Sequence, residues 1–234
     1  MWSGPRNIST AMMRAWENRT DCTVIDEPFY PHYLQFTGID HPMADDIISH
    51  YPTDLDTALS LVKNIPDTGL IYQKQIITHM LEHIPLDWIA DVSNLFLIRH
   101  PAYMVSSYSM KREQLTPDDF GYPLLEKVFD VASSVTKQRP IVVDSTQFLG
   151  NPSAYLKHIC QHLNIDFQDT MLSWPKGTRS TDGIWEAHWY DSVKKSSGFG
   201  KPRTTMPTLN TQQQNVVDAC MPHYNALKQH ALLL

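Results

Sequence analysis

Short apolar runs alternate along the chain with amphipathic stretches of helical length. The clearest run is Asn94–Ile98, whose continuous apolar residues are typical of a parallel strand buried on both faces. Similar runs predict strands at Cys22–Ile25, Gly69–Tyr72 and Pro140–Val143. Helical periodicity and capping residues predict helices in other stretches: Ser9–Arg19, Leu55–Ile65, Gln75–Ile84, Ala102–Arg112, Asp118–Thr136, a helix beginning at Asn151-Pro152, and Thr211–Leu232. The alternation predicts an α/β fold, a three-layer sandwich around a central parallel sheet.

Some segments do not follow this pattern. His41–Pro52 is polar and punctuated by proline, which favours a mobile excursion, and Trp174–Arg203 is rich in Trp, Gly and Lys without clear periodicity. Ser9 or Asn7 is expected to cap the first helix. Only the dipeptide Met1-Trp2 precedes the first loop, so either the first strand is a stub or the natural start lies upstream.

Bulk composition restricts the class of protein. The 234 residues fit one domain, 1–234, with enough apolar material for a single core. A net charge of −6 argues against a broad nucleic-acid-binding face. Cys22, Cys160 and Cys220 are odd in number and far apart, so no disulfide framework is expected and a reducing cytoplasm is the simplest compartment. No apolar run approaches the roughly 18 residues of a membrane span, so no membrane partner is expected.

Residues suited to anion binding gather first in the opening loop, Gly4–Thr10. A Gly-Pro turn leads to Arg6 and then to a Ser-Thr pair at the start of a helix. Loop amides and a helix N-terminus donate hydrogen bonds to anions, and an arginine adds a planar fork of N–H groups. The loop departs from a Walker A motif, because Arg6 replaces the lysine and Ile8 stands where a second glycine would ease the turn. Alone, it is equally consistent with a capped helix after a turn.

Further polar residues follow the predicted strands. Glu27, Arg99 and Asp144 come just after strand ends, and ligands bind at the carboxyl ends of parallel strands, so these groups are expected to converge with the Arg6 loop on one site. Arg99 offers a planar fork suited to a phosphate. Ser107 lies roughly two helical turns later, on a face that can point to the same ligand. The structural alternative is a helix-capped crossover in which Arg99 pairs with an acidic residue.

Taken in order, the two motifs resemble those of the sulfotransferase superfamily. The loop 4–10 resembles the loop that binds the 5′-phosphosulfate of 3′-phosphoadenosine 5′-phosphosulfate (PAPS), and Leu97–Tyr108 resembles the motif that binds its 3′-phosphate. Val142–Ile165 resembles the segment that follows in the same family. The resemblance implies a P-loop NTPase-like fold. It also implies a donor-binding site made of Pro5, Arg6, Asn7, Ile8, Ser9, Thr10, Arg99 and Ser107.

The resemblance further implies the reaction. A sulfuryl group would move from PAPS to a hydroxyl or amine of a small, partly apolar acceptor, and 3′-phosphoadenosine 5′-phosphate (PAP) would be released. Arg6 is expected to stabilise the charge that develops on the bridging oxygen. In the family a late basic loop closes over the 3′-phosphate. The candidates for it here are Lys194, Lys195, Lys201 and Arg203, of which Lys201 is included in the predicted donor site.

Two residues compete for the role of general base, which takes the acceptor proton. Glu27 lies in a Glu-Pro element similar to one that carries the base in related sulfotransferases, and its structural alternative is an ion pair with Arg6 or another basic residue that shapes the loop. His79 is the rival. Lys74 and Thr78-His79 resemble the Lys-Thr-His element of other members, although intervening residues interrupt it.

Other functional interpretations stay open from the sequence. Asp144, after an apolar run, matches a Walker B aspartate and would hold magnesium in a P-loop kinase that uses ATP on a small molecule. Ile8 in the loop is consistent with a degenerate, non-catalytic nucleotide-binding protein. His79-x-x-Glu82-His83 has the spacing of an inverted zinc-protease motif, but no third ligand follows from the sequence, so no metal site is predicted.

Overall fold

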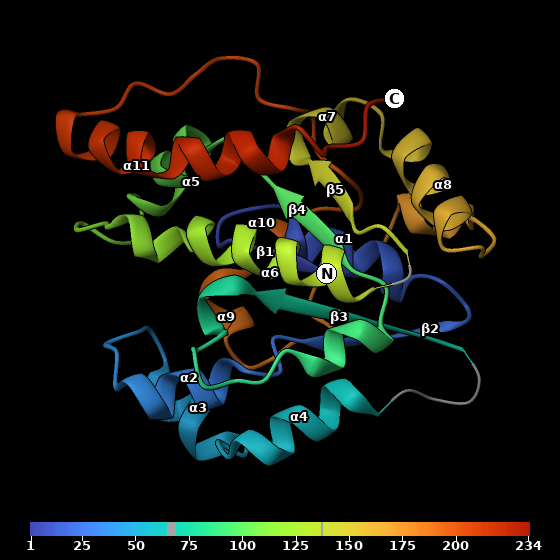
Figure 1. Cartoon of the computed structure of the whole chain (residues 1–234), viewed down its shortest axis with the longest axis horizontal. Coiled ribbons are helices and arrows are strands. Elements are labelled where there is room, and N and C mark those ends of the chain that lie inside the picture. Colours follow the sequence, from blue (N-terminus) through green and yellow to red (C-terminus); the bar gives the residue numbers. More distant parts are fainter. Residues whose placement is uncertain (65–68, 137) are drawn as a thin grey trace.

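One parallel sheet organises the chain (Figure 1). The computed structural model describes residues 1–64, 69–136 and 138–234, and within them five strands pair in the order β2-β3-β1-β4-β5. Each neighbouring pair is parallel. The strands are β1 (Trp2–Ser3), β2 (Cys22–Asp26), β3 (Leu70–Ile76), β4 (Leu95–Ile98) and β5 (Ile141–Asp144). The predicted α/β class with a central parallel sheet is confirmed, and β1 lies at the centre of that sheet.

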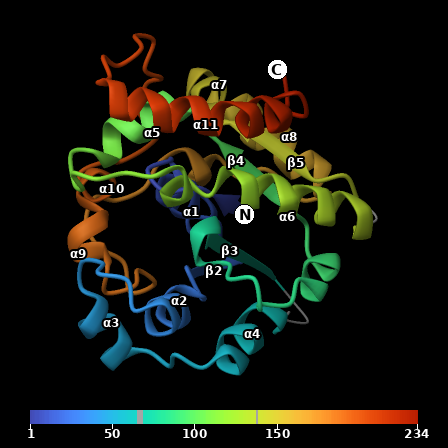
Figure 2. The ribbon, with the colours of Figure 1, turned by 60° about the vertical axis from the view of Figure 1, so that its left-hand side comes forward.

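Helices connect the strands and cover the sheet. They are α1 (Ser9–Glu17), α2 (Tyr30–Thr37), α3 (Ala44–His50), α4 (Leu55–Lys63), α5 (Pro101–Tyr108), α6 (Tyr122–Val135), α7 (Ser145–Gly150), α8 (Pro152–His162), α9 (Glu186–Trp189), α10 (Asp191–Lys194) and α11 (Thr211–Lys228). Short 3₁₀ turns cover Ile77–His79, Asp87–Asp91, Pro117–Phe120 and Asp169–Leu172. Figure 2 shows α5, α6 and α11 together on one side of the molecule and α2, α3 and α4 on the other.

The sheet separates two hydrophobic cores, because successive side chains of a strand point to opposite faces. On β4, Phe96 and Ile98 pack into the core that also contains side chains of α5, α6 and α11. Leu95 and Leu97 pack into the second core, with side chains of α1 and α8. These four side chains are almost completely buried, which explains the unbroken apolar run of this strand.

Two predicted elements are wrong. Gln75–Ile84 is not a helix: β3 continues to Ile76 and a 3₁₀ turn follows at Ile77–His79. The strand extends past its apolar start through polar residues that are buried and bonded, such as Gln73, whose Nε2 donates to the Val62 carbonyl at 2.8 Å. His41–Pro52 is not a mobile excursion, because it contains α3.

Several predicted boundaries also shift. The first helix has Ile8 at its N-cap, with no side-chain cap from Asn7 or Ser9, and ends at Glu17. The helix predicted over Leu55–Ile65 ends at Lys63, and Ile65 lies outside the described residues. The helix predicted over 118–136 is divided at Gly121 into a 3₁₀ turn and α6. The predicted Asn151 cap is confirmed, since its side chain accepts from the Ala154 N–H at 3.2 Å. The predicted helices over 102–112 and 211–232 end at Tyr108 and Lys228.

Gly121→Ala is expected to destabilise the fold by roughly 2–4 kcal/mol. Gly121 has a φ of 62°, and an added Cβ would lie 2.6 Å from Ile77 Cγ2 and 3.1 Å from Thr78 Cγ2. Gly38→Ala is the matched control, because Gly38 has a φ of 60° and nothing lies within 4 Å of an added Cβ. The control is expected to lose only about 1–2 kcal/mol. Urea unfolding measures both variants, and equal losses would contradict the importance of the contact with the 3₁₀ turn.

Candidate active site

A cavity of about 840 Å³ opens at the carboxyl ends of the central strands. The loop after β1, Glu27 after β2, His79 beyond β3 and Arg99 after β4 all line it, as the topology of a parallel sheet requires. The cavity brings together the predicted donor-site residues Pro5, Arg6, Asn7, Ile8, Ser9, Thr10, Arg99 and Ser107 and the two candidate bases, Glu27 and His79. Lys201 is exposed and is not among the lining residues, whereas Gly200 and Arg203 are.

The two sequence motifs interlock in space. Arg6 Nε donates to Ser107 Oγ at 3.2 Å, and Arg99 Nη1 donates to the Arg6 carbonyl at 2.6 Å. Asn7 Nδ2 donates to the Leu97 carbonyl at 3.0 Å. Each contact joins the loop after β1 to β4 or α5, so the loop is held in place by the second motif.

The loop turns at Arg6 instead of at a second glycine. Arg6 has a φ of 57°, in the left-handed region, while Ile8 has a φ of −93°, which any residue adopts. A left-handed residue in such a loop arranges successive amides around a concavity that suits an anion. The geometry therefore accounts for Ile8, whose side chain packs against the core that contains α1.

Positive charge concentrates at one end of the cavity. Within residues 1–64, 69–136 and 138–234, Arg6, Arg99 and Arg203 make no ion pair with an acidic side chain. Burial, followed by the charges of Arg203 and Arg6, lowers the pKa of Arg99 to about 10. Burial also lowers the pKa of Arg6. Partly desolvated arginines that repel one another and lack a carboxylate partner fit a multiply charged anion.

The two candidate bases lie next to each other at another part of the cavity wall. Glu27 Oε2 is 3.8 Å from His79 Nδ1, and Glu27 Oε1 is 2.5 Å from Lys74 Nζ. Glu27 pairs with Lys74 and not with Arg6, so the predicted structural alternative, an ion pair with a basic residue, is present with Lys74 as the partner. Its φ of 46° is a strained left-handed conformation, of the kind that concentrates at functional sites.

The pKa values of the two candidate bases shift in opposite directions. Burial raises the pKa of the Glu27 carboxyl, and the Lys74 ammonium offsets this only in part. Burial, with the charges of His41 and Lys74, holds the pKa of His79 well below its ordinary value. His79 stacks on Tyr30 with ring centroids 4.3 Å apart. A general base works best with a pKa near the working pH, so the raised pKa favours Glu27 over His79.

Sequence reasoning missed two members of this cluster, Asp26 and Tyr190. Asp26 Oδ1 lies 3.0 Å from Lys74 Nζ, and the Tyr190 hydroxyl lies 2.5 Å from the same atom. The sequence had a signal for Asp26, an acidic residue directly after an apolar strand. Tyr190 had none, because it comes from a segment without periodicity.

The structure assigns other partners to the residues behind the kinase and metal interpretations. Asp144 caps α7, where its Oδ1 accepts from the Thr146 N–H at 2.8 Å, and its Oδ2 accepts from the Tyr224 hydroxyl at 2.7 Å. It does not line the cavity. His83 turns to His32, with 2.9 Å between their Nε2 atoms. Within the described ranges no cluster of three or more His, Cys, Asp and Glu side chains is suited to a metal ion.

Acid is expected to destabilise the protein partly through His41. Burial and then the charge of Arg112 lower the pKa of His41 from its ordinary 6.5 to about 4. The unfolded chain therefore binds the proton first, so this contribution to stability is complete above about pH 6.5 and is lost as the pH falls through about 4. His41→Gln removes the titration and is expected to flatten the dependence of Tm on pH over this range. A variant with the wild-type dependence would contradict the assignment.

The comparison with protein families and curated proteins covers nearly the whole chain. The family model of the sulfotransferase domain matches residues 1–231. Two Arabidopsis thaliana proteins, branched-chain-amino-acid aminotransferase-like proteins 2 and 1, are each 29% identical over 232 residues. The match covers 98% of this chain and 41% of each relative, so the chain spans less than half the length of these relatives. No helix in the described part of the chain has the length and apolar character needed to cross a membrane.

The chain is similar in fold to solved structures of sulfotransferases. A sulfotransferase from Alicyclobacillus acidocaldarius is 12% identical with a TM-score of 0.57, and the match covers 99% of this chain and 96% of that chain. A sulfotransferase domain from the curacin biosynthetic pathway is 14% identical with a TM-score of 0.55, covering 94% and 95%. At such identity the likeness shows the fold, which is of the P-loop NTPase type, while the family match over residues 1–231 is independent of it. The family match over nearly the whole chain, together with the cavity at the strand ends, establishes that the chain belongs to the sulfotransferase family.

Proposed function

We propose that this domain, residues 1–234, transfers a sulfuryl group from PAPS to a hydroxyl or amine of a small acceptor, releases PAP, and does so in the cytoplasm. The observation that carries the proposal is the arrangement of one cavity. Its lining contains Arg6, Arg99 and Arg203, which make no ion pair with any acidic side chain of residues 1–64, 69–136 and 138–234. Hydrogen bonds from Arg6 to Ser107 and from Arg99 to Arg6 join the two motifs, and a buried carboxylate, Glu27, lies on the wall. Such a reaction requires the protein to bind two anionic groups of the donor and to remove one proton from the acceptor.

The residues present fit such a donor. Arg6, with the loop amides and the hydroxyls of Ser9 and Thr10, would hold the 5′-phosphosulfate. Arg99 and Ser107 would hold the 3′-phosphate, and Arg203 extends the positive charge there. The donor supplies the sulfuryl group. Lys201 lies outside the cavity lining, so its predicted membership of this site requires the late segment to close over the 3′-phosphate.

Proton removal belongs to Glu27 in this proposal. Its Oε2 faces His79 and is free of Lys74, which contacts Oε1, so Oε2 is the oxygen that would receive the acceptor proton. Arg6 would stabilise negative charge on the leaving oxygen, where a fixed cation is most effective because little water surrounds it.

Aromatic side chains line another part of the cavity. They are Tyr30, Tyr33, Tyr108 and Trp189, with Ile39 beside them. A wall of this kind binds apolar surface through ring contacts and burial of area from water. It supports a partly apolar acceptor that presents one hydroxyl or amine to Glu27.

Binding of nucleotides tests the proposal without an identified acceptor. Thermal shift and calorimetry with PAP, AMP and ATP–magnesium are expected to show stabilisation that is strongest with PAP, because a ligand that binds only the folded state raises Tm. Preference for ATP–magnesium would favour the kinase alternative and overturn the proposal, as would equal affinities for PAP and AMP. PAP binding without consumption of PAPS across a panel of alcohols, phenols and amines would favour the non-catalytic alternative.

A further inference from the structure

A buried lysine joins three oxygen-bearing side chains on the cavity wall. Lys74 Nζ lies 2.5 Å from Glu27 Oε1, 3.0 Å from Asp26 Oδ1 and 2.5 Å from the Tyr190 hydroxyl. The Lys74 and Asp26 side chains are 1% and 2% exposed, and that of Glu27 is 9% exposed. Two carboxylates therefore share one ammonium out of contact with bulk water. The closer the ammonium lies to Glu27 relative to Asp26, the more strongly it stabilises the charged form of Glu27.

The Tyr190 hydroxyl affects the position of the Lys74 ammonium through its contact with Asp26. It lies 2.9 Å and 2.7 Å from the two oxygens of Asp26, and it accepts from Lys74 Nζ and from Trp185 Nε1 at 3.1 Å. With both lone pairs used in this way, its one proton goes to Asp26, whose oxygens are nearer than Glu27 Oε1 at 3.4 Å. Asp26 also accepts from the Gly183 N–H at 3.2 Å. Because these donors already bond to the Asp26 carboxylate, Asp26 depends less on the Lys74 ammonium for stabilisation of its charge. The ammonium can therefore stay in contact with Glu27.

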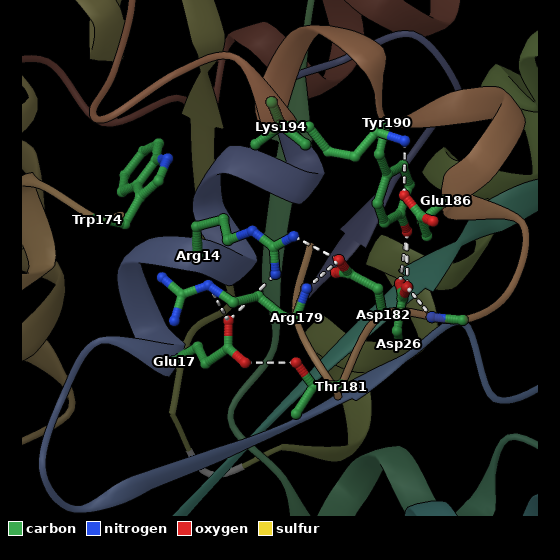
Figure 3. Close-up of polar contacts among 12 residues, drawn as sticks. Arg14, Glu17, Asp26, Trp174, Arg179, Thr181, Asp182, Glu186, Tyr190 and Lys194 are labelled. Atoms are coloured by element: carbon green, nitrogen blue, oxygen red, sulfur yellow. Dashed lines mark hydrogen bonds and ion pairs between the residues drawn. The ribbon is translucent and has the colours of Figure 1, made fainter. Parts of the chain in front are cut away.

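Distant parts of the chain hold Tyr190 in this position (Figure 3). It follows α9, in the segment that the sequence left without a predicted element. Arg14 of α1 pairs with Asp182 at 2.6 Å, and Asp182 accepts from the Arg179 N–H at 2.8 Å. The Arg14 and Asp182 side chains are 1% and 0% exposed. The segment is thus fixed to α1 by a buried ion pair just before the residues that reach Asp26 and Lys74.

We infer that Tyr190 is a positioning residue: by donating to Asp26 it leaves the Lys74 ammonium on Glu27, and so keeps the Glu27 carboxylate ionised and oriented toward the cavity. The inference rests on the proposed role of Glu27 as the base. Tyr190 acts through Asp26 and Lys74, beside a longer contact of 3.4 Å between its hydroxyl and Glu27 Oε1, and has no part in the proton transfer itself.

All the charged and titratable groups around Glu27 enter the test. They are Asp26 on its own strand, Lys74 on β3, His79 in the 3₁₀ turn, Tyr30 on α2 and Tyr190 after α9. Burial raises the pKa of Glu27, Lys74 lowers it, Asp26 raises it and the Tyr190 hydroxyl lowers it. Removing the Tyr190 hydroxyl and removing the Asp26 charge are therefore expected to move the pKa of Glu27 in opposite directions.

Titration of the Glu27 carboxyl carbon by ¹³C NMR measures this directly in the full chain, with Glu27→Gln used to identify the signal. Tyr190→Phe keeps the ring and is expected to raise the pKa of Glu27 by roughly half a unit or more. Asp26→Asn removes the competing carboxylate and is expected to lower it by about one unit. A Tyr190→Phe titration that matches the wild type, or two shifts in the same direction, would overturn the inference.

Separate measurements distinguish a variant that fails to fold from a failure of the proposal that Glu27 is the base. Thermal unfolding and PAP calorimetry report whether each variant is folded. If Tyr190→Phe does not fold, Trp185→Phe replaces it. Trp185→Phe removes a donor to the Tyr190 hydroxyl and is expected to shift the Glu27 pKa by less than half as much as Asp26→Asn; an equal or larger shift would overturn the inference. The titration needs no turnover. If Glu27→Gln keeps sulfuryl transfer, the base assignment fails whatever the titration gives.

Discussion

Glu27→Gln is expected to lower turnover by about 10²–10⁴-fold, the usual contribution of a positioned general base. Glutamine keeps the size of the side chain and can still accept from Lys74 through its amide oxygen, but it cannot take a proton from the acceptor. Glu27 is not among the residues proposed to bind the donor, so PAP affinity is expected to change by less than about 2-fold. Single-turnover consumption of PAPS and PAP calorimetry measure the two effects separately.

His79→Gln is the matched comparison for this result. His79 Nδ1 lies 3.8 Å from Glu27 Oε2 and, in the described part of the chain, makes no hydrogen bond. Its lowered pKa weakens it as a proton acceptor. A loss of less than about 10-fold is expected if His79 only orients the acceptor or the carboxylate. The opposite order, with His79→Gln inactive and Glu27→Gln active, would transfer the base role to His79.

The anion-binding half of the candidate site could be predicted from the sequence because its chemistry is local. The loop 4–10 and the stretch around Arg99 each hold the required residue types within one short segment at a strand end. The sheet places strand ends together, so Arg6, Arg99 and Ser107 meet without any further information. The same reasoning located Glu27 and allowed an ion pair with Arg6 or another basic residue, but it could not name Lys74, because the sequence cannot say which cation lies on a neighbouring strand.

The rest of the site depends on contacts between distant segments. Lys74 lies on β3 among polar residues that do not follow a strand pattern, so the sequence predicted that the strand ended at Tyr72 and that a helix covered Gln75–Ile84. A buried lysine is stable there only because Asp26 and Glu27, from the adjacent strand, compensate its charge. Tyr190 and Arg203 come from the late segment, whose course is determined by the ion pair between Arg14 and Asp182. No periodicity within that segment encodes this arrangement.

Arg99→Ala is expected to weaken PAP binding by roughly 10- to 100-fold, since a hydrogen-bonded charge contributes about 1.5–3 kcal/mol. The effect has two sources that must be separated. Arg99 is proposed to hold the 3′-phosphate, and its Nη1 also donates to the Arg6 carbonyl and so supports the loop. AMP, which lacks the 3′-phosphate, reports the loop alone. Its affinity is expected to fall by less than about 3-fold.

The ratio of the PAP and AMP affinities, measured by calorimetry, is therefore the decisive quantity. Lys201→Ala is the control variant: it removes one positive charge from the exposed late segment, outside the cavity lining, and is expected to leave the ratio nearly unchanged. Equal losses for the two nucleotides in Arg99→Ala would mean that Arg99 only shapes the loop. A large loss of the ratio in Lys201→Ala would mean that the late segment closes over the 3′-phosphate through Lys201, as the sequence resemblance predicts.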